Sequence, residues 1–229
     1  MQYQLSRIIA GPFLRGLWHP QVVGGENIPD TGGAILASNH LSVIDSVFLP
    51  LMLTRPVTFA AKSEYFTSKR PGLRLMGLYI RATGQLAVDR EGARAAQATL
   101  EGALALLQKG ELFGIYPEGT RSPDGRLYRG RSGVGWLAMK SGLPVIPVAM
   151  IGTDRVLPPG RTIPRRGPVE IRIGKPMTFG DGAGGDREAP GKARRAIADD
   201  VVRAIQELSG QEYVPMYASV RKEQLAAGA

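Results

Sequence analysis

Residues 32–45 read GGAILASNHLSVID, and this stretch decides the predicted fold because a short apolar run ends in a cluster of polar side chains. Two glycines open the run, and residues 34–38 are small or aliphatic, which is typical of a buried strand. Similar apolar runs recur along the chain, without an internal repeat, at 57–61, 85–88, 112–116, 145–150 and 169–173. The sequence therefore predicts a set of short, buried strands.

Helical patterns separate several of these predicted strands. Residues 91–109 place leucines on one face and stop at Gly110, residues 132–141 form a shorter pattern, and residues 190–208 carry an apolar stripe. Strands that alternate with helices predict an α/β fold with a mostly parallel central sheet flanked by helices. Such sheets bind ligands at the carboxyl ends of their strands. Residues 210–229 have weak periodicity and predict a packed or frayed tail.

Composition excludes several kinds of site. The chain has 229 residues and a mass of 24.6 kDa, enough for one domain with its own core. It has no cysteine, which excludes disulfides, a thiol nucleophile and cysteine-ligated metals. Its two histidines are too few for a three-histidine metal site, and no metal is predicted. The net charge of +9 favours an anionic partner, unless the arginines simply occupy the surface.

His40 and Asp45 are the first candidate catalytic pair. A neutral imidazole can take a proton near neutral pH, and a carboxylate on its second nitrogen would orient it. Five residues place the two side chains about 140° apart on an ideal helix, so they cannot share a helix face. A histidine in the loop before a helix and an aspartate in its first turns could still meet. The alternative is a lone histidine that satisfies a helix N-terminus.

A second polar segment, Glu118-Gly119-Thr120-Arg121, follows another predicted strand. The glycine lets the backbone approach a ligand, the threonine donates a hydrogen bond, and the guanidinium can bind a phosphate through two nitrogens. The alternative is an ordinary polar turn. Arg90 and Lys62 also follow predicted strands, although a surface ion pair and a surface lysine are the simpler interpretations.

Four blocks in this order resemble those of the glycerolipid acyltransferases. They are N-H-x-x-x-x-D at residues 39–45, G-x-x-F-I-D-R at 84–90, F-P-E-G-T-R-S at 116–122 and the segment LPVIPV at 143–148. Ala87 and Tyr116 replace two aromatic residues of the family pattern. The blocks cover residues 24–175 and together make a specific signal. The chain is most similar to the short bacterial members of the 1-acyl-sn-glycerol-3-phosphate acyltransferase family.

The resemblance implies the glycerolphosphate-acyltransferase type of fold and a transfer reaction. A fatty acyl group would move from an acyl thioester, acyl-CoA or acyl-carrier protein, to the free hydroxyl of 1-acyl-glycerol-3-phosphate, which gives phosphatidic acid. His40 would be the general base, and Asp45 would hold its tautomer and stabilise the imidazolium. The thioester is a co-substrate, so no permanently bound cofactor is expected. The residues then assigned to substrate binding are Arg90, Glu118, Gly119, Thr120, Arg121 and Lys62.

The N-terminal residues 1–18 have roughly helical spacing, which Pro12 interrupts, and the pattern alone is compatible with a core helix or an interfacial helix. A lipid substrate favours docking to an anionic membrane surface. We therefore predict an amphipathic docking segment at 1–20, one α/β acyltransferase domain at 21–229, and a peripheral, monotopic position on the cytoplasmic face of the cell membrane. The residues assigned to docking are Leu5, Ile8, Ile9, Phe13, Leu17 and Trp18.

Alternatives from other classes stay open at this stage. A non-catalytic anion- or nucleic-acid-binding protein would explain the charge, but aromatic residues are only 7% of the chain and the basic residues are scattered, so no nucleic-acid partner is expected. A different acceptor, such as glycerol-3-phosphate, another lysophospholipid or a glycolipid, would fit the same motifs. A hydrolase using His40 lacks support because the chain has no G-x-S-x-G nucleophile elbow.

Overall fold

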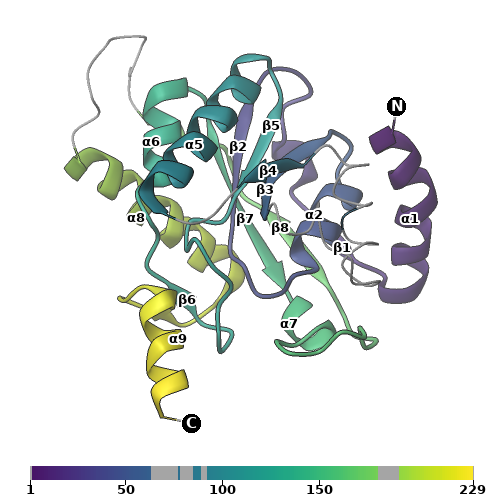
Figure 1. The fold of residues 1–229 in the computed structure, drawn as a ribbon. Helices are drawn as coiled ribbons and strands as arrows, with labels where there is room; N and C mark the ends of the chain where they lie inside the picture. Colours follow the sequence, from purple (N-terminus) through teal and green to yellow (C-terminus); the bar gives the residue numbers. More distant parts are fainter. Residues whose placement is uncertain (1, 63–76, 78–84, 89–91, 180–190, 229) are drawn as a thin grey trace.

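The computed structural model describes residues 2–62, 77, 85–88, 92–179 and 191–228 (Figure 1). The helices are α1 (Gln2–Trp18), α2 (Asp45–Met52), α5 (Gly92–Gln108), α6 (Gly133–Ser141), α7 (Thr153–Val156), α8 (Gly191–Ser209) and α9 (Ala218–Ala227), with a short 3₁₀ helix, η1 (Gly25–Asn27). The strands are β1 (Gln21–Val23), β2 (Ala34–Ser38), β3 (Val57–Lys62), β4 (Leu86–Val88), β5 (Leu112–Ile115), β6 (Leu127–Tyr128), β7 (Val145–Ile151), β8 (Glu170–Ile173) and β9 (Tyr213–Val214).

The main sheet has the strand order β1-β8-β7-β2-β5-β3-β4, with β2 in the middle. Neighbouring strands run parallel, except that β7 and β8 are antiparallel. Helices α5, α6 and α8 cover one face of this sheet, and α1 and α2 lie on the other side (Figure 1). The predicted α/β fold with a mostly parallel central sheet flanked by helices is thereby confirmed.

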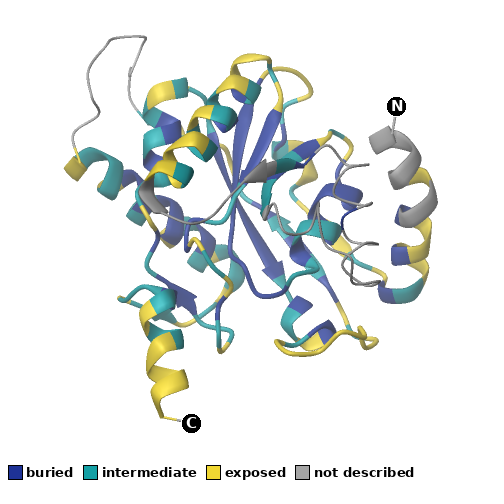
Figure 2. Cartoon of the chain, in the orientation of Figure 1, coloured by how far each residue is buried: buried dark blue, intermediate teal, exposed yellow. Residues whose placement is uncertain are grey.

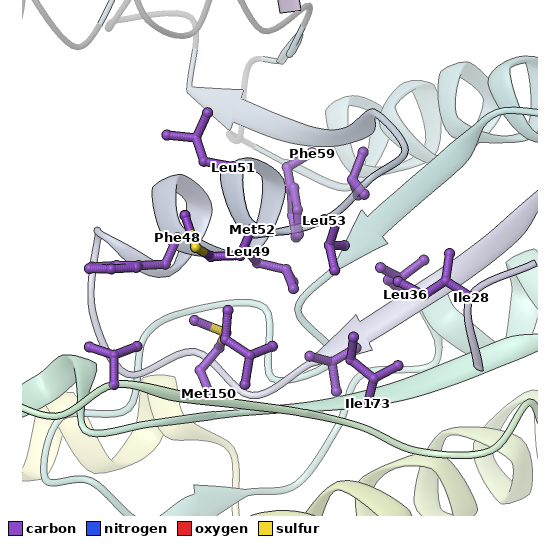
Figure 3. Close-up of a cluster of buried hydrophobic side chains, with 14 of the residues drawn as sticks. Ile28, Leu36, Phe48, Leu49, Leu51, Met52, Leu53, Phe59, Met150 and Ile173 are labelled. Carbon is purple, nitrogen blue, oxygen red and sulfur yellow. The ribbon is translucent and has the colours of Figure 1, made fainter. Parts of the chain in front are cut away.

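The alternation of side chains along β2 connects two hydrophobic cores. Ala34 and Leu36 belong to the cluster shared with α1 and α2, whereas Ile35 and Ala37 belong to the cluster under α5, α6 and α8. Every residue of β2 is buried, as the dark blue central strands show in Figure 2. Figure 3 shows part of the first cluster, to which β2 contributes Leu36 and the elements α2, β3, β7 and β8 contribute other labelled side chains. A strand buried on both faces is a rigid support for the residues that follow it.

The strands without an apolar run were not predicted. β1 is three residues long, and all three are exposed although β1 pairs in parallel with β8. β6 and β9 are two residues each and pair only with one another. Register and position in the tertiary structure, and not hydrophobic patterning, define such short edge elements.

The side chains of α1 differ in their exposure. Trp18 is buried, its ring meets that of Phe48 edge-on with centroids 5.8 Å apart, and its Nε1 donates to the Arg165 carbonyl at 2.7 Å. Leu17 is half-buried against the same cluster. Ile8 and Phe13 are 67% and 64% exposed. Of the residues assigned to membrane docking, Trp18 therefore contributes to the core. Leu5 and Ile9 have side chains outside the described residues.

Candidate active site

His40 and Asp45 lie in the loop between β2 and α2, at the carboxyl end of the central strand. Asp45 is the first residue of α2, and its Oδ2 is 2.9 Å from His40 Nδ1. The backbone amides of Leu41 and Ser42 donate to the same oxygen at 2.7 and 2.8 Å. The loop folds over the carboxylate, so two residues that could not share a helix face are brought into contact.

The contact has a chemical consequence for the imidazole. A carboxylate at Nδ1 holds the proton there, and Nε2 is then the basic nitrogen. Asp45 is fully buried, and 8% of the His40 surface is exposed. The imidazole is thus oriented from within the protein while part of its surface is accessible to a reacting group. The pair has the geometry that general-base catalysis needs.

A row of aromatic rings supports the imidazole from one side. The rings of His40 and Tyr116 are stacked at 3.8 Å with an angle of 10°, and the ring of Phe59 stacks on Tyr116 at 5.1 Å. The Tyr116 hydroxyl shares a hydrogen bond of 2.8 Å with Ser46 Oγ on α2. Gly114 makes this row possible, because a Cβ at that position would overlap the Phe59 ring.

Glu118 connects the second polar segment to His40. Its Oε1 accepts from the His40 amide at 3.2 Å, and its Oε2 accepts from the Tyr128 amide at 3.0 Å. The Ser122 amide in turn donates to the His40 carbonyl at 2.7 Å. Burial raises the pKa of Glu118 to about 7, although the two amide hydrogen bonds act to lower it. Residues 118–122 are therefore fixed against both backbone polar groups of His40.

The loop between Glu118 and Ser122 carries three candidate substrate-binding residues, Gly119, Thr120 and Arg121. Gly119 has φ 74°, a conformation that favours glycine, and a Cβ there would contact the Arg131 side chain. Thr120 is half-buried and Arg121 is exposed. Thr120 Oγ1 accepts a hydrogen bond of 2.6 Å from Lys222 Nζ, which reaches the loop from α9. A hydroxyl and two cationic side chains thus gather on the loop whose Glu118 and Ser122 contact the His40 backbone.

Other sequence-predicted residues are not brought into this arrangement by the described structure. Arg90 lies outside the described residues, and Lys62 ends β3 but its side chain lies outside them. Their assignment to substrate binding stays a prediction. In the described ranges, no group of three or more histidine, aspartate or glutamate residues could hold a metal ion.

Three residues that contact the site or its loop, Asn39, Gln211 and Lys222, were not assigned a role from the sequence. Asn39 is buried and exchanges hydrogen bonds with the backbone of Met150 on β7, at 2.9 and 2.7 Å. Its Nδ2 also donates to Gln211 Oε1 at 2.7 Å. Asn39 precedes His40 in the motif, which was the available signal. Gln211 and Lys222 come from the C-terminal residues, which the motif blocks do not include.

Comparisons with known proteins identify relatives of this chain. The acyltransferase family profile matches residues 19–151. The chain is 32% identical over 158 residues to a chloroplastic 1-acyl-sn-glycerol-3-phosphate acyltransferase of Arabidopsis thaliana, which covers 68% of this chain and 43% of that protein. It is 28% identical over 194 residues to the 1-acyl-sn-glycerol-3-phosphate acyltransferase of Bacillus subtilis, covering 83% of this chain and 88% of that one.

A solved structure is also similar. The crystal structure of the 1-acyl-sn-glycerophosphate acyltransferase from Thermotoga maritima superposes with a TM-score of 0.67 at 30% identity, covering 90% of this chain and 79% of the other. The chain spans about half the length of several curated plant and algal relatives that it matches, such as 49% of the Brassica napus protein and 55% of the Chlamydomonas reinhardtii protein. The sequence motifs, the fold and the family profile lead to the same conclusion: this chain belongs to the acyltransferase family.

Proposed function

We propose that this protein transfers a fatty acyl group from an acyl thioester to the free hydroxyl of 1-acyl-glycerol-3-phosphate, giving phosphatidic acid. The observation that carries the proposal is the His40–Asp45 contact of 2.9 Å at the end of β2, with the polar loop 118–122 fixed against the backbone of the same histidine. Support also comes from relatives named 1-acyl-sn-glycerol-3-phosphate acyltransferases.

In the proposed reaction, Nε2 of His40 takes the proton of the acceptor hydroxyl while its oxygen attacks the thioester carbonyl. A tetrahedral intermediate forms and then collapses, which breaks the carbon–sulfur bond and forms the ester. The imidazolium returns its proton to the departing thiolate, so the enzyme ends in its starting state. Asp45 stabilises the imidazolium in between. No covalent acyl-enzyme is required.

The loop residues supply binding in this proposal. Arg121 and the Thr120 hydroxyl bind the acceptor phosphate, and the backbone at Gly119 allows close approach. In the acceptor, the reacting hydroxyl and the phosphate ester are on adjacent carbons. A phosphate on the loop next to His40 would therefore place the hydroxyl near Nε2, which lowers the entropic part of the barrier.

The proposal also includes the acyl donor and the membrane to which the protein docks. The thioester is acyl-CoA or an acyl-carrier protein, used as a co-substrate. The exposed Ile8 and Phe13 on α1 and the net charge of +9 favour peripheral docking to an anionic bilayer, on the cytoplasmic face of the cell membrane. Over the described residues, no helix has the length and apolar character needed to cross a bilayer.

The reaction is tested in mixed micelles with labelled palmitoyl-CoA and lysophosphatidic acid. Wild type should form phosphatidic acid, and His40→Ala should retain less than about one thousandth of that rate if the base contributes as in a triad. The matched control is His19→Asn at the other histidine, which is exposed and has φ 44°, a conformation that asparagine tolerates. Full activity in folded His40→Ala would overturn the mechanism. Parallel assays with acyl-carrier protein, glycerol-3-phosphate and other lysophospholipids identify the preferred donor and acceptor.

A further inference from the structure

The C-terminal helix α9 places one lysine against the motif loop. Lys222 Nζ donates to Thr120 Oγ1 at 2.6 Å, across 102 residues of sequence. The lysine is half-buried, so its position is defined by the surrounding protein and not only by solvent. Figure 1 shows α9, in yellow, at one end of the molecule next to β6.

The start of α9 is fixed by a cluster of arginines around one tyrosine. The guanidinium groups of Arg129, Arg131 and Arg195 lie over the Tyr217 ring at 5.8, 5.2 and 5.9 Å from its centroid. Arg195 Nη2 also donates to the Tyr217 hydroxyl at 3.0 Å, and Arg131 Nη2 donates to Ser219 Oγ at 3.3 Å. These contacts hold the first turn of the helix, and the second turn carries Lys222 to the loop.

The charges around Lys222 are poorly balanced. Burial and the neighbouring Arg121 both lower the pKa of Lys222, and Glu118 offsets them only in part. Glu118 has a pKa of about 7 and carries only part of a negative charge at neutral pH. Within the described ranges, Lys222 forms no ion pair with an acidic side chain. Two neighbouring cations that Glu118 neutralises only in part create a positive potential that favours an anionic ligand.

We propose that Lys222 binds a phosphate group of a substrate on the loop 118–122, together with Arg121. This inference rests on the proposed function. The Thr120 oxygen accepts from the ammonium group, which leaves the hydroxyl hydrogen able to donate to a phosphate oxygen. The phosphate can come from the lysophosphatidate acceptor or from the CoA part of the donor, because both carry it.

The test compares Lys222→Met, Lys222→Arg and the control Lys175→Met, which changes an exposed lysine on the loop after β8. Loss of a charge-assisted phosphate contact should raise KM for the phosphate-bearing substrate about tenfold with little change in kcat. Lys222→Arg should recover part of the loss, and Lys175→Met should resemble wild type. Two phosphate-free analogues show whether the phosphate bound by Lys222 belongs to the acceptor or to the donor: monoacylglycerol replaces lysophosphatidate, and an acyl-N-acetylcysteamine thioester replaces acyl-CoA.

Each outcome has a defined meaning. A KM increase for lysophosphatidate that disappears with monoacylglycerol assigns Lys222 to the acceptor phosphate. An increase for acyl-CoA that disappears with the short thioester assigns it to the donor. Equal KM values for wild type and Lys222→Met overturn the inference, and the proposed function stands if wild type remains active.

A binding measurement separates this inference from the turnover assay. Calorimetry with lysophosphatidate in detergent micelles, and with CoA alone, requires no catalysis. Weaker binding of either probe to Lys222→Met than to Lys175→Met supports the inference even if no product forms. Identical binding to both variants, or no binding to wild type, overturns it. Melting curves of all variants verify that they are folded.

Discussion

Replacing Glu118 with glutamine should remove a defined part of the pH dependence of folding. Burial raises the pKa of Glu118 from 4.5 to about 7 in the folded protein. The folded chain then binds this proton more tightly than the unfolded chain between these two values. The contribution to stability is therefore fully present below about pH 4.5 and is lost as the pH rises through about 7.

The size of this contribution follows from the two pKa values. Their difference corresponds to roughly 3 kcal/mol, and between pH 5 and pH 8.5 the free energy of unfolding should fall by about 2.5 kcal/mol through Glu118 alone. Glu118 is only 2% exposed, so solvent screens its charge little. Glutamine cannot titrate, but its single side-chain oxygen can accept from only one of the His40 and Tyr128 amides, so the variant also loses about 1 kcal/mol at every pH.

Urea denaturation from pH 5 to pH 8.5, followed by the fluorescence of the two tryptophans, measures this difference. The stability of wild type relative to Glu118→Gln should decrease with pH by about 2.5 kcal/mol, because titration of all other groups cancels in the comparison. Glu207→Gln, at an exposed position on α8, should show the slope of wild type. Parallel curves for wild type and Glu118→Gln would refute the argument that burial dominates the electrostatics of this carboxyl.

Three further substitutions test other parts of the molecule. Asp45→Asn removes the carboxylate that accepts the Nδ1 proton of His40, and it should lower kcat by a factor of about 10² to 10⁴ with little effect on KM. A kcat within twofold of wild type would contradict the proposed His40–Asp45 pair. Gly114→Ala places a methyl group where the Phe59 ring lies and should lower the free energy of unfolding by about 2 kcal/mol in chemical denaturation. It should also lower kcat, because the Phe59 ring stacks on Tyr116, which in turn stacks on His40. Unchanged stability and rate would mean that the row of rings does not position the base. Phe13→Ser should weaken co-sedimentation with anionic vesicles about tenfold, as expected when one exposed aromatic ring enters the interface. Its melting curve gives the cost of losing the edge-on contact with Trp18 at 6.3 Å, and equal vesicle binding would disprove docking through Phe13.

The central part of the fold could be predicted because its signals are local. The run at 34–38 is apolar throughout, which identified a buried strand and the edge of the sheet where polar residues follow. The motif blocks identified His40 and the loop at 118–122. What the sequence could not provide was the path of the loop that brings Asp45 to His40, since an ideal helix would separate them.

Contacts between distant segments account for what was missed. Asn39 reaches Gln211 across 172 residues, and the lysine from α9 reaches Thr120 across 102. Neither C-terminal residue belongs to a motif or to a strong periodic pattern. Only the folded chain, which pairs β9 with β6 and then turns into α9, places these side chains at the site. Residues 210–229 were predicted to be a packed or frayed tail. Residues 211–222 are mostly half-buried, whereas residues 223–228 are exposed.

The C-terminal residues therefore belong to the site, although the family profile ends at residue 151. Gln211 binds Asn39 on one side and donates to the Gly125 carbonyl at 2.6 Å on the other, so it joins the loop before α2 to the loop after β5. These two loops carry the proposed base and the proposed phosphate ligands. Their separation decides whether a hydroxyl and a phosphate on adjacent carbons can be bound at once, and small errors in such positions are costly for catalysis. The residues within the family profile thus carry the proposed base and the proposed phosphate ligands, and Gln211, beyond the profile, connects the two loops that hold them.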